Sequence, residues 1–134
     1  MAEISARPTP EPSALTQAYW DGIAAGEIRL QCCDGCGALR HYPRLLCSRC
    51  YSDTYHWIAA SGRGQVHSWT VAHHPYHAAF VTEVPFTLVI VDLEEGPRAM
   101  GRWRGNTPHI GQRVIGRVLA RDGGADLHFE AAAD

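Results

Sequence analysis

The sequence contains no lysine, because all 12 of its basic residues are arginines. A mechanism that depends on a lysine Schiff base is therefore excluded, and so is a P-loop, whose lysine reaches the nucleotide phosphates. Any permanently cationic contact to a phosphate must come from arginine. The formal net charge is −2, which argues against a nucleic-acid-binding module, since such modules present a strongly basic surface.

Long apolar runs are also missing, and no stretch approaches the roughly 20 apolar residues that cross a bilayer. The first twelve residues, MAEISARPTPEP, include an early glutamate and lack the apolar segment of a secretory signal. We therefore expect a cytoplasmic protein with no membrane association. Thiols stay reduced in that compartment, so clustered cysteines hold a metal more often than they form disulfides.

All five cysteines lie in the segment QCCDGCGALRHYPRLLCSRC. Cys33-x2-Cys36 and Cys47-x2-Cys50, ten residues apart, have the spacing of a zinc ribbon, in which two turns each direct two thiolates at one point. Four thiolates leave no open position for water, so we expect one structural zinc ion. A rubredoxin-like iron site and a redox dithiol remain alternatives. Cys32 is left over, because Cys32-x3-Cys36 would break the symmetry of the turns.

The region before the cysteines predicts an arm and a helix. Residues 1–12 contain three prolines among polar residues, which is typical of a flexible arm. A short amphipathic helix is predicted over 13–26, with Ser13 as its N-cap and Gly26 as its stop. Its apolar residues are Leu15, Tyr19 and Ile23 at helical spacing, with Trp20 off the main stripe. The helix therefore has more apolar surface than one face buries. It either docks on its own domain or offers these residues to a partner.

After the cysteines the apolar residues alternate with a period of two, which indicates strands. We predict them at 54–60, 64–73, 86–93, 97–104, 112–121 and 125–130. The apolar run FTLVIVDL should be the most buried strand. Short strands with a break near 105–111 favour a five-stranded barrel of the OB type. The predicted fold is mainly β, with an N-terminal helix, a rubredoxin-like zinc ribbon over 27–53 and the OB-fold barrel over 54–134.

Two groups of polar residues in the barrel are candidates for binding an anion. Alternation places Arg98, Arg102 and Arg104 on one strand face, which either holds phosphates through forked hydrogen bonds or forms a solvated outer face. His73 and His77 are predicted in an exposed loop at the barrel rim, where ligands often bind. No Ser/His/Asp or Cys/His set stands out by spacing, so the sequence shows no catalytic machinery.

The order of these motifs resembles a known family, the zinc-ribbon plus OB-fold proteins associated with acyl-CoA metabolism, long catalogued as a domain of unknown function. The resemblance covers about residues 15–129. It is carried by AYWDGIAAGEIRLQCCDGCG, YPRLLCSRC, SGRGQVHSWTV, the Val84-Pro85 step and HIGQRV. The resemblance implies that Cys33, Cys36, Cys47 and Cys50 are the zinc ligands. It also implies that Tyr19, Trp20 and Ile23 lie on a helix near the acyl-CoA or partner surface.

The resemblance further implies a non-catalytic accessory subunit of a thiolase-like enzyme, a thiolase-related aldolase or a hydratase. Such a subunit aids assembly of the complex and helps to enclose the CoA moiety. Two other functions stay open, namely a nucleic-acid-binding ribbon and barrel module, and a stand-alone acyl-CoA-binding protein. The salt dependence of any DNA affinity separates the nucleic-acid-binding module from the other functions. Calorimetry with a CoA ester tests for the stand-alone acyl-CoA-binding protein.

Overall fold

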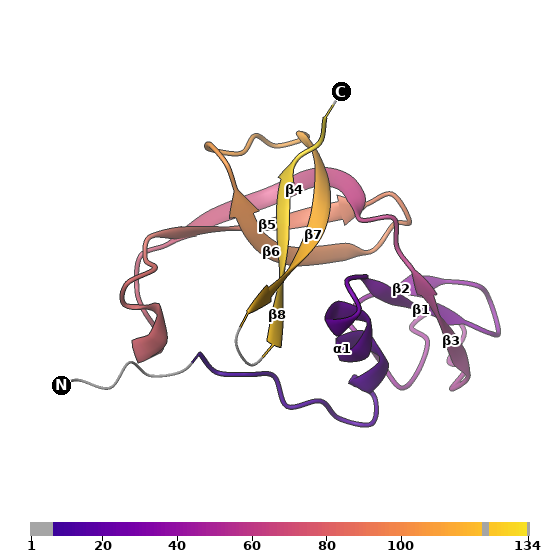
Figure 1. Ribbon diagram of the computed structural model, residues 1–134. Helices are drawn as coiled ribbons and strands as arrows, with labels where there is room; N and C mark the ends of the chain where they lie inside the picture. Colours follow the sequence, from indigo (N-terminus) through magenta and orange to yellow (C-terminus); the bar gives the residue numbers. More distant parts are fainter. Residues whose placement is uncertain (1–6, 122–123, 134) are drawn as a thin grey trace.

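The computed structural model describes residues 7–121 and 124–133 (Figure 1). Of the predicted arm, residues 1–6 lie outside the described residues, and 7–12 form neither helix nor strand. The elements in chain order are α1 (Gln17–Ala24), β1 (Arg29–Cys33), β2 (Leu39–Arg40), β3 (Tyr55–Ala59), β4 (Arg63–Ala72), η1 (Ala78–Phe80), β5 (Phe86–Leu93), β6 (Arg98–Arg104), β7 (Arg113–Arg121) and β8 (Gly124–Ala131). The mainly β fold with one preceding α-helix is therefore confirmed.

Three short strands form the sheet of the ribbon, in the order β2-β1-β3. All pairs are antiparallel, and β3 pairs with β1 along its whole length, from Arg29↔Ala59 to Cys33↔Tyr55. The strand predicted over 54–60 thus pairs within the ribbon sheet and not with a barrel strand. Alternation identifies a strand but not its partner, and here the partner precedes the cysteines. The ribbon and the barrel meet between β3 and β4.

The other five strands close into a barrel in the order β4-β5-β6-β8-β7. Neighbours are antiparallel except β6 and β8, which run parallel. The barrel closes where β7 pairs with the first residues of β4, from Arg63↔Ile115 to Gln65↔Arg113. This strand order is that of an OB-fold, and it confirms the predicted five-stranded barrel. Figure 1 shows the barrel beside the smaller ribbon, with α1 between them.

The barrel core forms where one face of each strand turns inward. On β5 the inward residues Val89 and Val91 are fully buried, whereas Ile90 between them is 36% exposed. Phe129 from β8 fills the centre and is also fully buried. A Cβ added at Gly101 would lie 2.7 Å from the Cδ2 atom of Phe129, so only glycine fits opposite this ring.

The helix α1 begins at Gln17 with Thr16 at its N-cap, so the predicted N-cap Ser13 was wrong: Ser13 lies in the preceding turn, where its Oγ accepts from the Thr16 N–H at 3.2 Å. It ends where Gly26 adopts a φ of 89° and its N–H donates to the Ile23 carbonyl at 3.0 Å, a glycine stop as predicted. Ile23 is only 3% exposed, because α1 packs on β1 and on the β7–β8 pair. No helix in the described part of the chain has the length and apolar character to span a membrane.

Candidate functional site

Two tight turns, here called the knuckles, position the thiols of the ribbon. In the first, the Gly37 N–H donates to the Cys33 carbonyl at 2.9 Å. In the second, the Tyr51 N–H donates to the Cys47 carbonyl at 3.0 Å. Both Gly37 and Tyr51 have a positive φ, of 75° and 61°, so the same turn is closed once by glycine and once by tyrosine. The repeated Cys-x-x-Cys pattern therefore folds into two matching turns.

The knuckles bring four sulfur atoms together, with all Sγ atoms within 4.8 Å of one another. The Sγ atoms of Cys33 and Cys50 are 3.5 Å apart, and those of Cys36 and Cys47 are 3.7 Å apart. A tetrahedral zinc ion with Zn–S bonds of about 2.3 Å requires sulfur atoms about 3.8 Å apart. The cluster therefore fits one zinc ion with a complete shell of four thiolates.

The fifth cysteine, Cys32, stays outside this cluster. Its thiol lies near the backbone carbonyls of Gly37 and Cys33, at 3.7 and 3.9 Å from the sulfur. Side chains of successive strand residues point to opposite faces of a sheet, which directs Cys32 away from the face of Cys33. The exclusion of Cys32 from the predicted site agrees with this geometry.

Backbone amides favour the thiolate form inside the cluster. The N–H groups of Cys50 and Arg49 donate to the sulfur of Cys47 and lower its pKa to about 6. The N–H of Cys36 has the same effect on Cys33, whose pKa also lies below its ordinary value. At Cys50 the Ser52 N–H also favours the thiolate, but the neighbouring thiols and burial raise the pKa of Cys50 to about 11. Because zinc binds the thiolate and not the thiol, the turn geometry favours metal binding at Cys33 and Cys47.

An apolar groove of about 500 Å³ lies beside α1. It is bounded by the helix, the arm, the loop that holds η1 and the outer face of β5 and β6. Its apolar side chains are Tyr19, Trp20, Ile23, Phe80, Phe86, Leu88, Met100 and Leu127. Three of the four helix candidates therefore line this groove, whereas Leu15 lies outside its lining. Tyr19 also packs against the barrel core, and this burial raises its pKa to about 12.

Ion pairs close one rim of the groove. The Glu83 carboxylate accepts hydrogen bonds from Arg7 and from Arg102, the latter at 2.6 Å. The Asp126 carboxylate accepts from Arg7 and, at 2.9 Å, from Arg121. The hydrogen bonds that Glu83 accepts from Arg7 and Arg102, of which that from Arg7 has the larger effect, hold the pKa of Glu83 below its ordinary value. Arg7, in the arm predicted to be flexible, is thus anchored across the barrel. No local pattern reveals this network, because Arg7 and Asp126 are far apart in sequence.

The arginines predicted to share a face of β6 do not converge on one point. Arg98 pairs with Asp92 at 2.8 Å, and Arg102 lies 4.0 Å over the ring of Phe86 in the groove. Arg104 is exposed, and it makes no ion pair with any residue that the structure describes. Arg98 and Arg104 stand at the two ends of the strand, about 20 Å apart. Of the three, only Arg102 lies at the groove.

The histidine candidates lie in the loop between β4 and β5, as predicted. His73 is exposed, and the Nδ1 of His77 accepts a hydrogen bond from the Ala79 N–H at 3.0 Å. His77 therefore caps the short helix η1. Neither residue lines the groove, so the structure does not bring the histidines and arginines into a single site.

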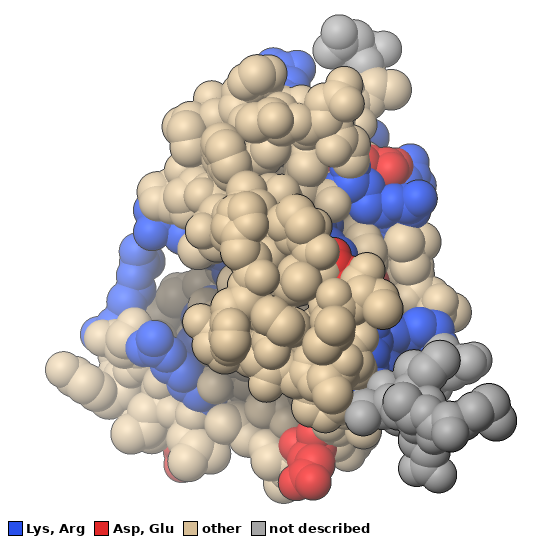
Figure 2. Space-filling view, turned by 90° about the vertical axis from the view of Figure 1, so that its left-hand side faces the viewer, with Lys and Arg blue, Asp and Glu red and all other residues tan. Residues whose placement is uncertain are grey.

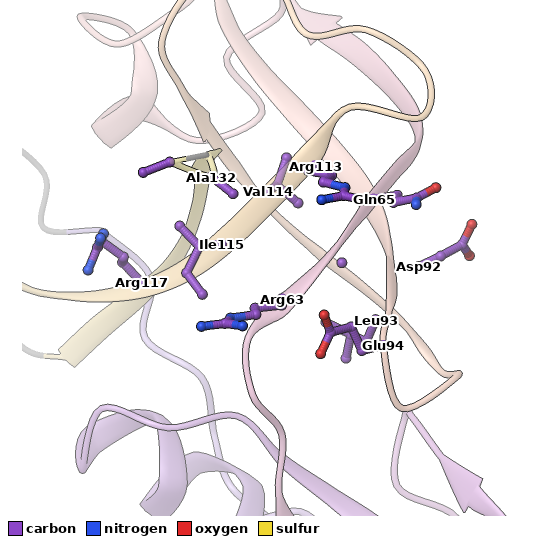
Figure 3. Close-up of a pocket in the computed structure, with 12 residues that line it drawn as sticks. Arg63, Gln65, Asp92, Leu93, Glu94, Arg113, Val114, Ile115, Arg117 and Ala132 are labelled. Carbon is purple, nitrogen blue, oxygen red and sulfur yellow. The ribbon is translucent and has the colours of Figure 1, made fainter.

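A second hollow, of about 720 Å³, lies over β4, β5 and β7. Figure 3 shows Arg117 on one side of it and the carboxylates of Asp92 and Glu94 on the other, with Arg63 and Arg113 on neighbouring strands. Its charges are mixed, and its lining includes none of the residues predicted from the sequence.

Comparison with known proteins assigns both parts of the chain. Residues 20–56 match the model of the ChsH2 rubredoxin-like zinc ribbon domain, and 57–118 match the ChsH2 C-terminal OB-fold domain. The solved structure of an Ltp2-ChsH2(DUF35) aldolase is similar, with a TM-score of 0.84 and 32% identity. That match covers 93% of this chain and 100% of the other.

Two curated relatives extend the comparison. A probable enoyl-CoA hydratase alpha subunit of Thermomonospora curvata is 35% identical over 112 residues, covering 81% of this chain and 34% of the relative. This chain thus spans about a third of that subunit. A DUF35 domain-containing scaffold protein of Methanocaldococcus jannaschii is 31% identical over 97 residues, covering 68% of each chain. With its ribbon, its barrel and these matches, the chain belongs to the DUF35 family of zinc-ribbon and OB-fold proteins.

Proposed function

We propose that this chain is a non-catalytic accessory subunit that docks on an enzyme acting on acyl-CoA, either a thiolase-superfamily enzyme or a hydratase. The observation that carries the proposal is the similarity to the Ltp2-ChsH2(DUF35) aldolase, in which a chain of this extent is part of an aldolase. The relative named as an enoyl-CoA hydratase alpha subunit supports it, because this chain corresponds to only a third of that subunit. The remaining two thirds have no counterpart in this chain.

The zinc ion has a structural role in this proposal. We assign Cys33, Cys36, Cys47 and Cys50 as its ligands, since their sulfur atoms have the separations that a tetrahedral shell requires. A closed shell leaves no coordination site for water or substrate. The metal therefore holds the ribbon in shape beside α1, and the chemistry belongs to the partner enzyme.

The groove beside α1 is the proposed contact with the partner or with the acyl-CoA. Trp20 is half-buried on its wall, and Met100 is 48% exposed on the opposite face. Aromatic and methionine side chains are enriched where protein surfaces bind. Leu15 is half-buried in the turn before the helix, whereas Ile23 and Tyr19 hold the helix on the barrel. Arg102, at the rim, is the cation placed to meet an anionic group.

The proposal is tested by purification through a tag on this chain from the native host, followed by identification of the proteins that co-purify. We expect a stoichiometric thiolase-like or hydratase protein. The variant Trp20→Ala should weaken this capture, whereas Ile110→Ala, an exposed apolar residue outside the groove, should not. Zinc-loaded protein that is recovered alone would contradict the accessory role.

The apolar groove also favours a second candidate, a stand-alone acyl-CoA-binding protein. An apolar wall with arginines at the rim suits an acyl chain attached to a phosphate-bearing carrier. Calorimetry of the isolated chain with a CoA ester separates the two functions. Tight binding without any partner favours the stand-alone protein, and binding that needs the partner favours the accessory subunit.

A further inference from the structure

The second half of β4 has a neighbouring strand on one side only. β4 pairs with β7 as far as Gln65, and Val66 bonds to the loop that precedes β7, with its carbonyl accepting from the Gly111 N–H at 2.8 Å. From Ser68 to Ala72, β4 pairs with β5 alone. Within the described ranges, 7–121 and 124–133, no other strand or loop bonds to this part of the backbone. The barrel therefore has an open strand edge here.

The ladder with β5 shows which backbone groups point outward. In an antiparallel pair, residues alternate between those that bond to the partner strand and those that point away. The Glu94 N–H donates to the Arg63 carbonyl at 3.0 Å, so every second residue of β5, from Asp92 back to Phe86, bonds to β4. Their partners after the bulge are Ser68, Thr70 and Ala72. The N–H and C=O groups of Trp69 and Val71 therefore face the open edge.

A β-bulge between Val66 and Ser68 precedes this edge, but the edge itself lacks three other features with which proteins protect exposed strands, namely charges, proline and a covering segment. Residues 64–82 contain no arginine, lysine, aspartate or glutamate. Trp69 is 38% exposed and Val71 is 36% exposed. The charge-free run continues into the loop after β4, where Tyr76 is 89% exposed. Figure 2 faces the side of the molecule that bears this loop, and the centre of that face is tan, with arginines along its margins.

The outer strand of the ribbon, β3, also carries no Arg, Lys, Asp or Glu, but its aromatic side chains are packed. Tyr55 and Trp57 meet edge to face with ring centroids 5.9 Å apart, and the guanidinium of Arg40 lies 5.4 Å over Tyr55. The edge of β4 therefore combines outward backbone groups with exposed apolar side chains, and β3 does not.

We propose that the edge of β4 at Trp69 and Val71 binds an extended strand of a partner protein by strand addition. The N–H and C=O groups of Trp69 lie about 7 Å along the edge from those of Val71. The backbone of an extended strand repeats its own donors and acceptors at the same interval and can pair with them. The added strand carries uncharged, apolar side chains, because Trp69 and Val71 flank it. A second copy of this chain would present the same short edge, Ser68 to Ala72, and the concentration dependence of amide exchange distinguishes it from a partner strand.

This surface is separate from the groove beside α1, so the inference stands whether or not the accessory role is correct. Amide hydrogen exchange of the full chain tests the edge first. The amides of Trp69 and Val71 should exchange fast, and those of Ser68, Thr70 and Ala72 slowly. Slow exchange at Trp69 and Val71 in dilute protein would overturn the inference, because the chain would already cover its own edge. Slow exchange only at high concentration would make a second copy the occupant and overturn the choice of partner.

Binding is then tested with a defined probe, an acetylated and amidated heptapeptide of alternating threonine and valine. Nuclear magnetic resonance of the full chain should show shifts confined to residues 67–72. Exchange of the Trp69 and Val71 amides should slow by about tenfold or more, as expected for newly hydrogen-bonded amides. The same peptide with every amide N-methylated has no backbone N–H to donate and should not bind. Absence of binding at millimolar peptide, or equal binding of the methylated peptide, overturns the proposal.

Variants of β4 provide the matched controls. Val71→Pro removes an outward N–H that β5 does not use, so the barrel should stay folded while peptide binding is lost. Val71→Ala keeps that N–H and should retain binding. Thr70→Pro removes a donor of the ladder itself and should lower the melting temperature. If Val71→Pro binds the peptide as the parent chain does, the edge is not the binding site.

Discussion

The ribbon and the barrel are held together by different means. Of residues 34–54, only Cys47 is buried. The barrel, by contrast, buries a continuous core, which the base of the ribbon joins through Ile28 and Leu30; its barrel members are Val66, Val89, Val91, Leu93, Ala99, Trp103, Val114 and Phe129. Burial of apolar surface stabilises a fold by about 25 cal/mol per Å², a source that the tip of the ribbon lacks. At the tip of the ribbon, metal binding supplies the stabilisation instead, and it is worth on the order of 10 kcal/mol in zinc-finger peptides.

The largest expected effect is therefore that of Cys47→Ser. Loss of one thiolate opens the zinc shell, so the zinc content should fall from one per chain towards zero, and the ribbon should unfold or the protein become insoluble. Metal analysis of the purified protein measures the first effect and solubility the second. The matched control is Cys32→Ser, which should keep its zinc, since the Cys32 thiol points to backbone carbonyls. Equal zinc loss from both variants would contradict the ligand assignment.

The second effect belongs to the barrel. Phe129→Ala should lower the free energy of unfolding by about 3–5 kcal/mol, because it leaves a cavity where a fully buried ring contacts Gly101 and Gly116. Chemical denaturation monitored by tryptophan fluorescence measures this loss. The variant should retain its zinc, and simultaneous loss of the metal would show that the ribbon depends on the barrel core.

The third effect occurs at the junction of the two regions. Desolvation of the half-buried His41 ring lowers its pKa to about 4, and the ring centroid lies 5.0 Å from that of Tyr19 on α1. The unfolded chain, with an ordinary pKa near 6.5, binds a proton more readily than the folded chain. His41 therefore contributes stability that is complete above pH 6.5 and is lost as the pH falls towards 4. In His41→Gln the free energy of unfolding should fall less steeply between pH 6.5 and 5 than in the parent chain, as measured by denaturation at each pH. An unchanged slope would contradict the burial of His41.

The smallest effect compares the two knuckles. Tyr51 occupies, at a φ of 61°, the place that glycine fills at Gly37. A side chain in this conformation costs roughly 1–2 kcal/mol, which the greater freedom of unfolded glycine offsets in part. Tyr51→Gly should therefore raise the zinc affinity by up to about fivefold, the equivalent of about 1 kcal/mol. Competition with a chelator measures the affinity. A lower affinity would mean that the Tyr51 ring stabilises the ribbon.

Much of the fold follows from local patterns. The strand predicted over 86–93 coincides with β5. A short apolar run that is bounded by turn residues is typical of a buried strand, so the local pattern was enough to predict it. The zinc cluster follows from spacing within a few residues, because each Cys-x-x-Cys turn is a local structure. In both cases the decisive interactions lie within the segment that carries the pattern.

Long-range relations were not predictable in the same way. The pairing of β3 with β1 depends on which strand comes within reach, and alternation contains no information about partners. The ion pairs of Arg7 with Glu83 and Asp126 join the arm to the loop before β5 and to strand β8, both far along the chain. For Ile23 the sequence left open whether the helix docks on its own domain or on a partner, and the residue is buried because the helix docks on its own domain as well as lining the groove.

The most direct test is to chelate the metal and then follow amide hydrogen exchange over the whole chain. It shows whether the metal stabilises the ribbon while the apolar core stabilises the barrel. Removal of zinc should abolish protection of the amides between 34 and 54. The barrel strands β4 to β8 should keep their protection, because none of the four zinc ligands belongs to their core. Loss of protection in both regions together would contradict this division, as would unchanged protection of the ribbon after the zinc is gone.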